Sequence, residues 1–570
     1  MQQHLLKILK EAENMITNKQ LADLIFPDIT ETVDDLEKRY PPRNLPEGAQ
    51  VTRFAPSPTG FLHTGSLFTS LVCRKVASQS KGVFYVRLED TDTKREIAGS
   101  GEQLLEQLHT FGIDPDEGYL GNHEKGDYGP YVQSQRARIY CVVIKHLLEE
   151  GKAYPCFCTA QDLEELRNEQ EAKKLNPGYY GEFAKCRNLS NEEKYERIKN
   201  GEHFVIRFRS EGNHENKIKV SDLVRGEFEI AENDQDIVIY KSDGLPTYHF
   251  AHAVDDHFMR TTTVIRGEEW VASLPIHVQL FRALGWKAPK YAHLPVIMKV
   301  DEETGNKRKL SKRNDREAAC SYFIEDGYLP QSLIMYLMTI ANSNFEEWIL
   351  ANKFEGMENF QFSFKKMSLE GALFDMGKLN FFARELLVKY NKDEFTDLAY
   401  KYAKKFNPEL KAAIEYDRDL FANIMNIDRE KANPRKDYEK FGNILDIIGF
   451  FYKDTYNKVI KEPLPFNEKF SKEDLIEALT AIKNELKTNT DEQAWFNDLK
   501  EIGTKLNYAA NNKDYKANPE AYKGNIGDLA EILRITLTGR KNAPNLCVVM
   551  YLLGLEETHR RIDAVISLLK

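Results

Sequence analysis

The chain lacks the features of several common protein classes. Its 570 residues contain seven cysteines, an odd number that argues for reduced thiols rather than a disulfide framework. No apolar run reaches the ~18 residues of a membrane helix, and the first residues carry no signal-peptide core or cleavage site. These absences predict a cytoplasmic protein with no membrane attachment.

The sequence also lacks an excess of basic residues. Its formal net charge is −10 at pH 7, which by itself argues against a nucleic-acid partner. A local basic stripe would be sufficient, however, because a phosphate contact acts over about a Debye length, ~8 Å at physiological salt. The basic residues that could form such a stripe, or simply lie on solvated helix faces, are Arg429, Lys431, Arg435, Lys436, Arg534, Arg540 and Lys541.

A strand, a turn and a helix follow one another early in the chain. The strand-like run Val51 to Ala55 breaks at two prolines, and RFAPSPTGFLHTGS (residues 53–66) leads into a helix with one apolar face. Free N–H groups and the helix dipole favour a phosphate at such a turn. His63 can donate to phosphate oxygens, and Gly65 lets a nucleotide approach the backbone.

A second run, KLSKR at residues 309–313, carries the complementary charge. Lys309, Lys312 and Arg313 provide three cations, and Ser311 a hydroxyl, for the same triphosphate. Each run alone is a weak signal. Three further runs stand between them in a fixed order: RLEDTD (87–92), DGLPTYHFAHAVDDHFM (243–259) and VIRGEEW (264–270).

With HTGS and KLSKR, these runs resemble the bacterial glutamyl-tRNA synthetases, which are class I aminoacyl-tRNA synthetases. One departure is that Ser66 replaces the second histidine of the general class I signature, a variation familiar in the glutamyl branch. The resemblance implies an α/β fold: a Rossmann-like catalytic domain with an inserted acceptor-binding α/β domain, followed by all-helical stem-contact and anticodon-binding domains.

The predicted domains follow from these runs and from the helical spacing beyond residue 320. Apolar residues from Leu5 to Ile16 recur at helical spacing, so the front end is expected to pack on the catalytic domain. The division is 1–48 N-terminal helical extension and linker, 49–136 first catalytic half, 137–248 inserted acceptor-end-binding domain, 249–320 second catalytic half with the KLSKR loop, 321–400 stem-contact domain and 401–570 helical anticodon-binding domain.

The resemblance also assigns the site residue by residue. Two arginines can each bind a carboxylate, and an acid can take the ammonium group. The implied glutamate pocket consists of Arg53, Ala55, Ser57, Glu89, Tyr248, His252 and Arg266. The implied ATP site consists of His63, Gly65, Ser66, Trp270, Lys309, Leu310, Ser311, Lys312 and Arg313, with His63, Lys309 and Lys312 as the catalytic residues.

The implied reaction uses ATP with Mg²⁺ to form glutamyl-adenylate and then transfers glutamate to the 3′-terminal adenosine of tRNA(Glu). Catalysis would rest on positioning and on charge stabilisation. The chain is expected to act as a monomer. Whether tRNA(Gln) is a second partner is left open by the sequence.

Three cysteines are arranged like the zinc-binding knuckle of some relatives. Cys156 and Cys158 form a C-x-C run, and Cys186 follows. Structural zinc takes four ligands, so Tyr179 or Tyr180 would have to complete the set. The incomplete set favours plain structural cysteines over zinc.

Several other functions remain as alternatives. A glutaminyl-tRNA synthetase usually has PPEPNG where this chain has APSPTG, and its anticodon domain is a β-barrel. A queuosine-modifying enzyme would end near residue 320. A small-molecule adenylyltransferase would not need the long helical tail, and a catalytically inactive tRNA-binding protein would not need an intact KLSKR.

Lys312→Ala is expected to lower the rate of glutamate activation by about 100-fold or more, because this lysine faces charge that builds on the phosphates during attack. Affinity for tRNA should change little. The measurement is ATP–pyrophosphate exchange with tRNA present, and near-normal turnover would remove Lys312 from the mechanism.

Overall fold

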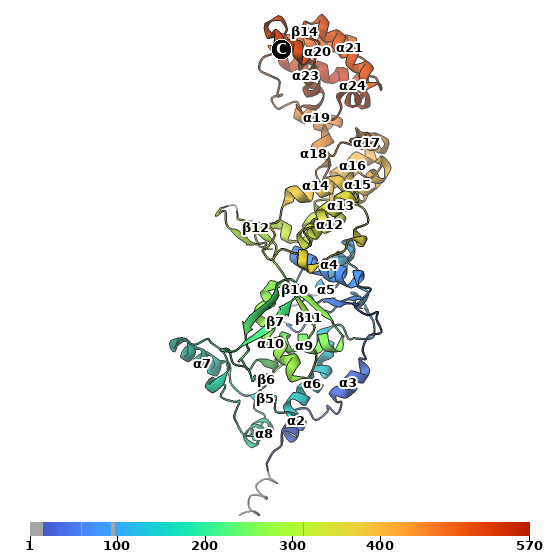
Figure 1. Ribbon diagram of the computed structural model, residues 1–570. Coiled ribbons are helices and arrows are strands. Elements are labelled where there is room, and N and C mark those ends of the chain that lie inside the picture. The colour runs from blue at the N-terminus through green and yellow to red at the C-terminus, as the bar shows by residue number, and fades with distance from the viewer. Residues whose placement is uncertain (1–14, 59, 93–96, 98, 302, 312) are drawn as a thin grey trace, which may run out of the picture. The chain divides into compact units, whose positions relative to one another are not determined.

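The computed structural model describes residues 15–58, 60–92, 97, 99–301, 303–311 and 313–570 (Figure 1). These form two compact units. One runs to Tyr322 and includes Ile334–Asp375, and the other consists of Phe323–Leu333 and Met376–Lys570. Within the described part of the chain, no helix has the length and apolar character that crossing a bilayer would require.

A mainly parallel sheet organises the first unit. Its first part has the order β1 (Val51–Phe54), β2 (Val83–Val86), β3 (Glu117–Tyr119), β4 (Glu124–Lys125), and its second part the order β10 (Thr263–Gly267), β11 (Lys290–Leu294), β7 (Lys217–Asp222), β8 (Gly226–Ala231). The two parts meet where the Thr262 N–H donates to the Val51 carbonyl at 3.0 Å. All four strands β1, β2, β10 and β11 run parallel to their neighbours, so their carboxyl ends lie at one edge.

Buried helices pack against this sheet. The described ones are α4 (Thr64–Gln79), α5 (Ser100–Thr110), α6 (Ala137–Glu149), α9 (Tyr248–Phe258) and α10 (Leu274–Ala283). Helices α9 and α10 pack on each other beside the second part of the sheet (Figure 1). Helix α9 is unusual because it buries Asp255 and Asp256 among apolar residues.

Residues 137–248 add a separate antiparallel sheet of β5 (Ala153–Cys156), β6 (Val205–Phe208) and β9 (Val238–Tyr240), with α7 (Ala160–Ala172) and α8 (Asn191–Lys199). The β7–β8 hairpin belongs to the same stretch of chain but joins the mainly parallel sheet, because Asp222 pairs with Tyr291 of β11. After β11 comes the hairpin of β12 (Met298–Val300) and β13 (Lys307–Lys309), which leads into KLSKR.

Beyond residue 319 the chain is almost entirely helical, as its spacing predicts. The longer helices are α11 (Cys320–Glu325), α12 (Pro330–Ala341), α13 (Phe345–Ala351), α14 (Met376–Leu387), α15 (Lys392–Phe406), α16 (Pro408–Tyr416), α17 (Arg418–Met425), α18 (Ile444–Ile448), α19 (Lys453–Val459), α20 (Lys472–Glu485), α21 (Glu492–Lys505), α22 (Asn512–Ala517), α23 (Ile526–Thr538) and α24 (Leu546–Leu569). Two short parallel strands, β14 (Tyr508–Ala509) and β15 (Gly524–Asn525), are the exception.

The described part of the front end packs on the rest of the first unit. Residues 1–14, which carry most of the predicted amphipathic helix, lie outside the described residues. Helices α2 (Asn18–Ile25) and α3 (Val33–Arg39) both begin with a capping box and bury Ala22 and Leu36 beside α6. The Glu37 carboxylate then accepts hydrogen bonds from His257 and Arg260, both at 2.6 Å, so this segment braces the end of α9.

Candidate active site

The turn that carries HTGS contacts the chain that follows KLSKR. His63 pairs with Ala319 as an isolated antiparallel bridge, and the Cys320 N–H donates to the Leu62 carbonyl at 3.1 Å. The Thr64 hydroxyl donates to the Glu317 carbonyl at 2.6 Å. The chain after KLSKR is therefore fastened to the turn that begins α4.

A cavity of about 990 Å³ opens at the carboxyl ends of β1 and β10. The predicted site residues on its wall are Arg53, Ala55, Ser57, His63, Gly65, Ser66, Glu89, Tyr248, Arg266, Trp270, Lys309 and Leu310. His252, Ser311 and Arg313 are not on that wall, and Lys312 lies outside the described residues. A single cavity thus brings together most of the residues that the motifs indicated.

The turn before α4 has the geometry of an anion site. His63 is the N-cap, and its Nδ1 accepts a hydrogen bond from the Gly65 N–H at 2.9 Å. A neutral ring in this arrangement carries its proton on Nε2. A Cβ on Gly65 would lie 3.2 Å from His63 Nδ1 and would press on that ring.

The start of the KLSKR run is held by a carboxylate. Asp315 accepts hydrogen bonds from Arg308 at 2.6 and 2.8 Å and from the Ser311 N–H at 2.8 Å. These bonds, led by the one from Arg308, hold the pKa of Asp315 well below its usual range. Lys309, on the cavity wall, lies 3.5 Å from Glu269 on the same wall.

A buried charge cluster supports the wall at β1. The Asp256 carboxylate accepts from Arg53 Nε at 3.2 Å and from Arg87 Nη1 at 2.7 Å, and it lies 2.8 Å from His252 Nδ1. Burial alone would raise the pKa of Asp256, but the two guanidinium groups outweigh burial and hold it far below its usual range. Because folding lowers this pKa, the carboxylate adds stability above about pH 4 that is lost on acidification.

His252 is therefore a buried neighbour of the cavity rather than part of its wall. It is fully buried, and burial lowers its pKa to about 4. Its Nε2 lies 3.2 Å from the Tyr291 hydroxyl. A neutral ring between Asp256 and Tyr291 fills space behind Tyr248, with which it stacks.

The neighbouring wall holds an acid and two aromatic rings. Glu89 accepts from Arg87 at 2.9 Å, and burial raises the pKa of its carboxyl. Tyr248 lies against Trp270, with ring centroids 4.3 Å apart. Arg266, 5% exposed, donates from Nε to His293 Nε2 at 3.0 Å and from Nη2 to His277 Nδ1 at 3.2 Å.

The quoted runs include Arg87 and Asp256, but no role was predicted for either of them or for His277 and His293. Arg87, Asp256, His277 and His293 all lie behind the wall. One signal was available in the sequence, because two adjacent acids in an otherwise apolar helix must find cationic partners when they are buried. The histidines carried no comparable signal.

The basic residues of the second unit that were predicted to contact tRNA differ in their exposure. Arg429 is buried and donates to the backbone carbonyls of Met425 and Leu387, so its prediction as a tRNA contact was wrong. Burial lowers the pKa of Arg534, and Arg435 forms an ion pair with Asp437. Arg540 donates to a backbone carbonyl at 3.3 Å.

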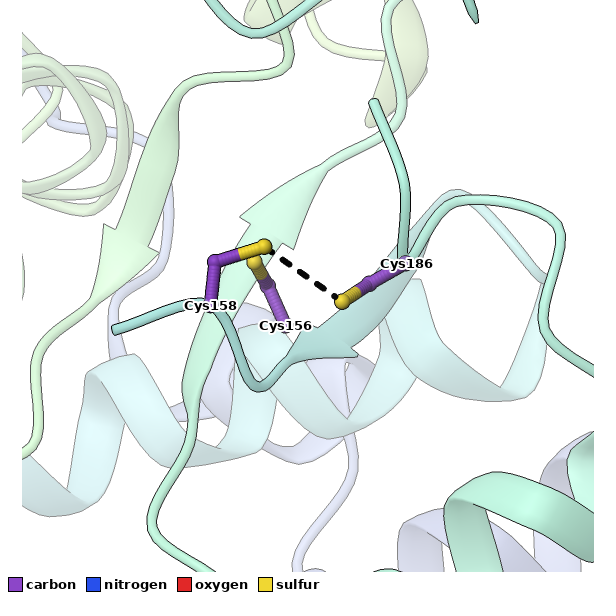
Figure 2. A group of neighbouring side chains, drawn as sticks. All are labelled: Cys156, Cys158 and Cys186. Atoms are coloured by element: carbon purple, nitrogen blue, oxygen red, sulfur yellow. Dashed lines mark hydrogen bonds between the residues drawn. The ribbon is translucent and has the colours of Figure 1, made fainter. Parts of the chain in front are cut away.

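Cys156, at the end of β5, lies together with Cys158 and Cys186 of neighbouring loops (Figure 2). Cys158 Sγ is 3.7 Å from Cys186 Sγ, and all three sulfurs lie within 4.8 Å of one another. The Tyr179 hydroxyl is 3.4 Å from Cys156 Sγ and 3.3 Å from Cys158 Sγ. The Tyr180 hydroxyl instead donates to the Asn176 carbonyl.

Comparisons with known proteins agree with this geometry. The family of tRNA synthetases class I (E and Q), catalytic domain, matches residues 50–381, and the anticodon binding domain matches residues 394–566. The glutamate–tRNA ligase of Clostridium beijerinckii is 46% identical over 552 residues, 96% of this chain and 100% of its own length. That of Sorangium cellulosum is 38% identical over 567 residues, 95% of this chain and 99% of its own.

A comparison with solved structures also finds a glutamate–tRNA ligase. The glutamate tRNA ligase from Elizabethkingia meningosepticum, crystallised in complex with its amino acid, is 29% identical and superposes with a TM-score of 0.73, covering 92% of this chain and 100% of that one. The chain belongs to the class I tRNA synthetases of the E and Q family. Its activity is that of a glutamate–tRNA ligase, which charges tRNA with glutamate. The predicted function is therefore confirmed over the glutaminyl alternative.

Asp256→Asn is expected to destabilise the protein by about 3–5 kcal/mol and to raise the KM for glutamate, because two buried guanidinium groups lose their shared counter-ion. Urea unfolding and pyrophosphate exchange measure the two effects. Asp114→Asn is the control, since it makes the same substitution at an exposed aspartate whose partner is the exposed His109. Equal stability of both variants would contradict the role given to Asp256.

Proposed function

We propose that the cavity between the two signature runs is where this ligase binds glutamate beside ATP and forms glutamyl-adenylate. The observation that supports this most directly is the backbone bridge between His63 and Ala319. The phosphate turn and Lys309 also lie on the cavity wall that carries Arg53, Glu89 and Arg266.

Glutamate has two carboxylates and one ammonium group, and the wall offers a partner for each. Arg53 and Arg266 are suited to the carboxylates, and Glu89 to the ammonium group. Asp256 already neutralises Arg53, whereas Arg266 forms no ion pair with a described carboxylate. We therefore assign the side-chain carboxylate of glutamate to Arg266, with the Tyr248 hydroxyl beside it.

ATP would occupy the part of the cavity next to α4. Its phosphates, with Mg²⁺ bound to them, would meet His63, the helix end at Gly65 and Ser66, and the cations of Lys309, Lys312 and Arg313. Trp270 and Leu310 would contact the nucleoside. His252 and Ser311 would act from behind the wall, His252 through Tyr248 and Ser311 through the loop bond to Asp315.

The chemistry then needs positioning more than covalent catalysis. A glutamate α-carboxylate oxygen attacks the α-phosphorus, the bond to the bridging oxygen breaks, and pyrophosphate leaves. A hydroxyl of the tRNA terminal adenosine next attacks the acyl carbon, and AMP leaves. The lysines would stabilise charge on the departing phosphates.

Arg266→Gln is expected to lower kcat/KM for glutamate by about 100-fold and to affect glutamine activation far less. A fixed guanidinium meets glutamate with charge-assisted bonds, but against glutamine it keeps an uncompensated charge, a penalty of about 2–5 kcal/mol. Pyrophosphate exchange with both amino acids and saturating tRNA measures the difference. If both substrates lose the same factor, Arg266 binds the α-carboxylate that they share.

The tRNA partner is tRNA(Glu). Whether the enzyme also charges tRNA(Gln) is a separate question. We propose that Arg435, Arg534 and Arg540 of the helical unit contact phosphates of the anticodon arm, because phosphate contacts of this kind depend on a local group of basic side chains. Charging assays with both transcripts decide the range of substrates. The cytoplasm is the proposed location, since charged tRNA is consumed there.

We propose that the cysteine cluster holds a structural zinc ion, with Tyr179 as the fourth group. Zinc–sulfur bonds of about 2.3 Å in a tetrahedron put sulfurs about 3.8 Å apart, close to the separation of Cys158 and Cys186. The Tyr179 hydroxyl also accepts from the Cys186 N–H at 3.0 Å, which keeps it beside the sulfurs. The ion would tie β5 to the loop that carries Cys186.

Protein purified from zinc-supplemented medium is expected to contain one zinc ion per chain, and Cys158→Ser is expected to lose it. Elemental analysis measures the content. Cys141→Ser is the control, because Cys141 lies apart from the cluster beside Tyr240. A wild-type chain without zinc would leave plain structural cysteines as the correct interpretation.

A further inference from the structure

Arg266 is held by two histidines and by no acid. Its Nε donates to His293 and its Nη2 to His277, and Nη1 is buried with no hydrogen-bond partner among the described residues. No described carboxylate forms an ion pair with this guanidinium. Arg266 is therefore a buried cation on the cavity wall that forms no direct ion pair with a described side chain.

The chemistry of guanidinium determines the state of both rings. Arginine only donates hydrogen bonds, so each imidazole nitrogen that faces it must offer a lone pair. His293 must then carry its proton on Nδ1, and His277 on Nε2. Neither ring can be an imidazolium while it accepts from Arg266.

The outer partners of the two rings match these tautomers. His293 Nδ1 lies 2.7 Å from an oxygen of Asp222, which can only accept. His277 Nε2 lies 3.0 Å from His249 Nδ1. Asp222 is itself held by the N–H groups of Val224 and Arg225, both at 2.9 Å, and by the His293 N–H at 3.0 Å.

Burial favours the same neutral state. His277 and His293 are 0% exposed and Asp222 is 3% exposed. Burial lowers the pKa of both histidines, and the charge of Arg266 lowers it further. Strand pairing supports the arrangement, because Arg266 of β10 stands opposite His293 of β11.

We propose that Asp222, His293, His277 and His249 are positioning residues that orient Arg266 with neutral acceptors and so leave its full charge for the substrate carboxylate. The inference rests on the role proposed above for Arg266. An acid in place of either histidine would hold the guanidinium equally well but would neutralise it. Glutamate would then lose its advantage over the uncharged glutamine.

A matched series at His277 separates orientation from charge. His277→Asn keeps a neutral acceptor, His277→Asp has the same shape with a negative charge, and His277→Leu has no acceptor. We expect the KM for glutamate to rise less than about 3-fold for Asn and about 10-fold or more for Asp and Leu, with the KM for ATP unchanged. Only His277→Asp should also reduce the preference for glutamate over glutamine by about 10-fold.

Control variants distinguish a failure of this inference from a failure of the role proposed for Arg266. His214→Asp introduces the same charge at an exposed histidine paired with Asp234 and should change neither KM. If His277→Asn and His277→Asp change the KM for glutamate and the preference for glutamate equally, the inference is overturned. A strong effect of Arg266→Gln in the same assays would still uphold the proposed function. If Arg266→Gln also has little effect, the proposed role of Arg266 fails as well.

A spectroscopic test determines the tautomers in the wild-type chain, and variants serve only to assign the signals. Imidazole nitrogen shifts in protein labelled with ¹⁵N-histidine should report Nδ1–H at His293 and Nε2–H at His277. The two signals are assigned from samples with His293→Gln or His277→Asn. The opposite tautomer at either ring, or an imidazolium, would overturn the proposal.

Discussion

The Asp256 carboxylate is the interaction on which the rest of the site depends. This carboxylate lies on α9, about two hundred residues later in the chain than its partners. It accepts hydrogen bonds from Arg53 of β1 and from Arg87, which follows β2, and all three side chains are buried. A buried guanidinium without such a partner would be costly. The segment at Glu37 braces the end of the same helix, so the front of the chain also contributes to the position of Asp256.

The two arginines of the cavity differ in how their charge is balanced. Asp256 neutralises Arg53, so Arg53 can orient a substrate without demanding a second charge. Arg266 is held by neutral rings and needs a counter-ion. With the assignment proposed above, a pocket with one balanced and one unbalanced arginine would distinguish glutamate from an uncharged analogue of nearly the same shape, because shape alone gives little discrimination between them.

Much of the fold and part of the site could be predicted from the sequence. The phosphate turn, the strand at Arg53 and the helical second unit all have local signals in periodicity, prolines and glycine. The role of Asp256 could not be predicted, since its partners depend on where α9 packs. Burial of Arg429 had no signal either, because an arginine that donates to backbone carbonyls looks in the sequence like one that faces solvent. The pairing of β7 with β11 likewise depends on contacts between distant segments.

The most direct test of this account is a double-mutant cycle between Arg87 and Asp256, measured as free energy of unfolding. Arg87 is fully buried and lies off the cavity wall, so its replacement by methionine tests the charge cluster and not substrate contact. With Asp256→Leu as the second change, we predict a coupling free energy of about 2 kcal/mol or more. The double variant should lose less stability than the sum of the two single losses. Losses that add to within about 0.5 kcal/mol would contradict it.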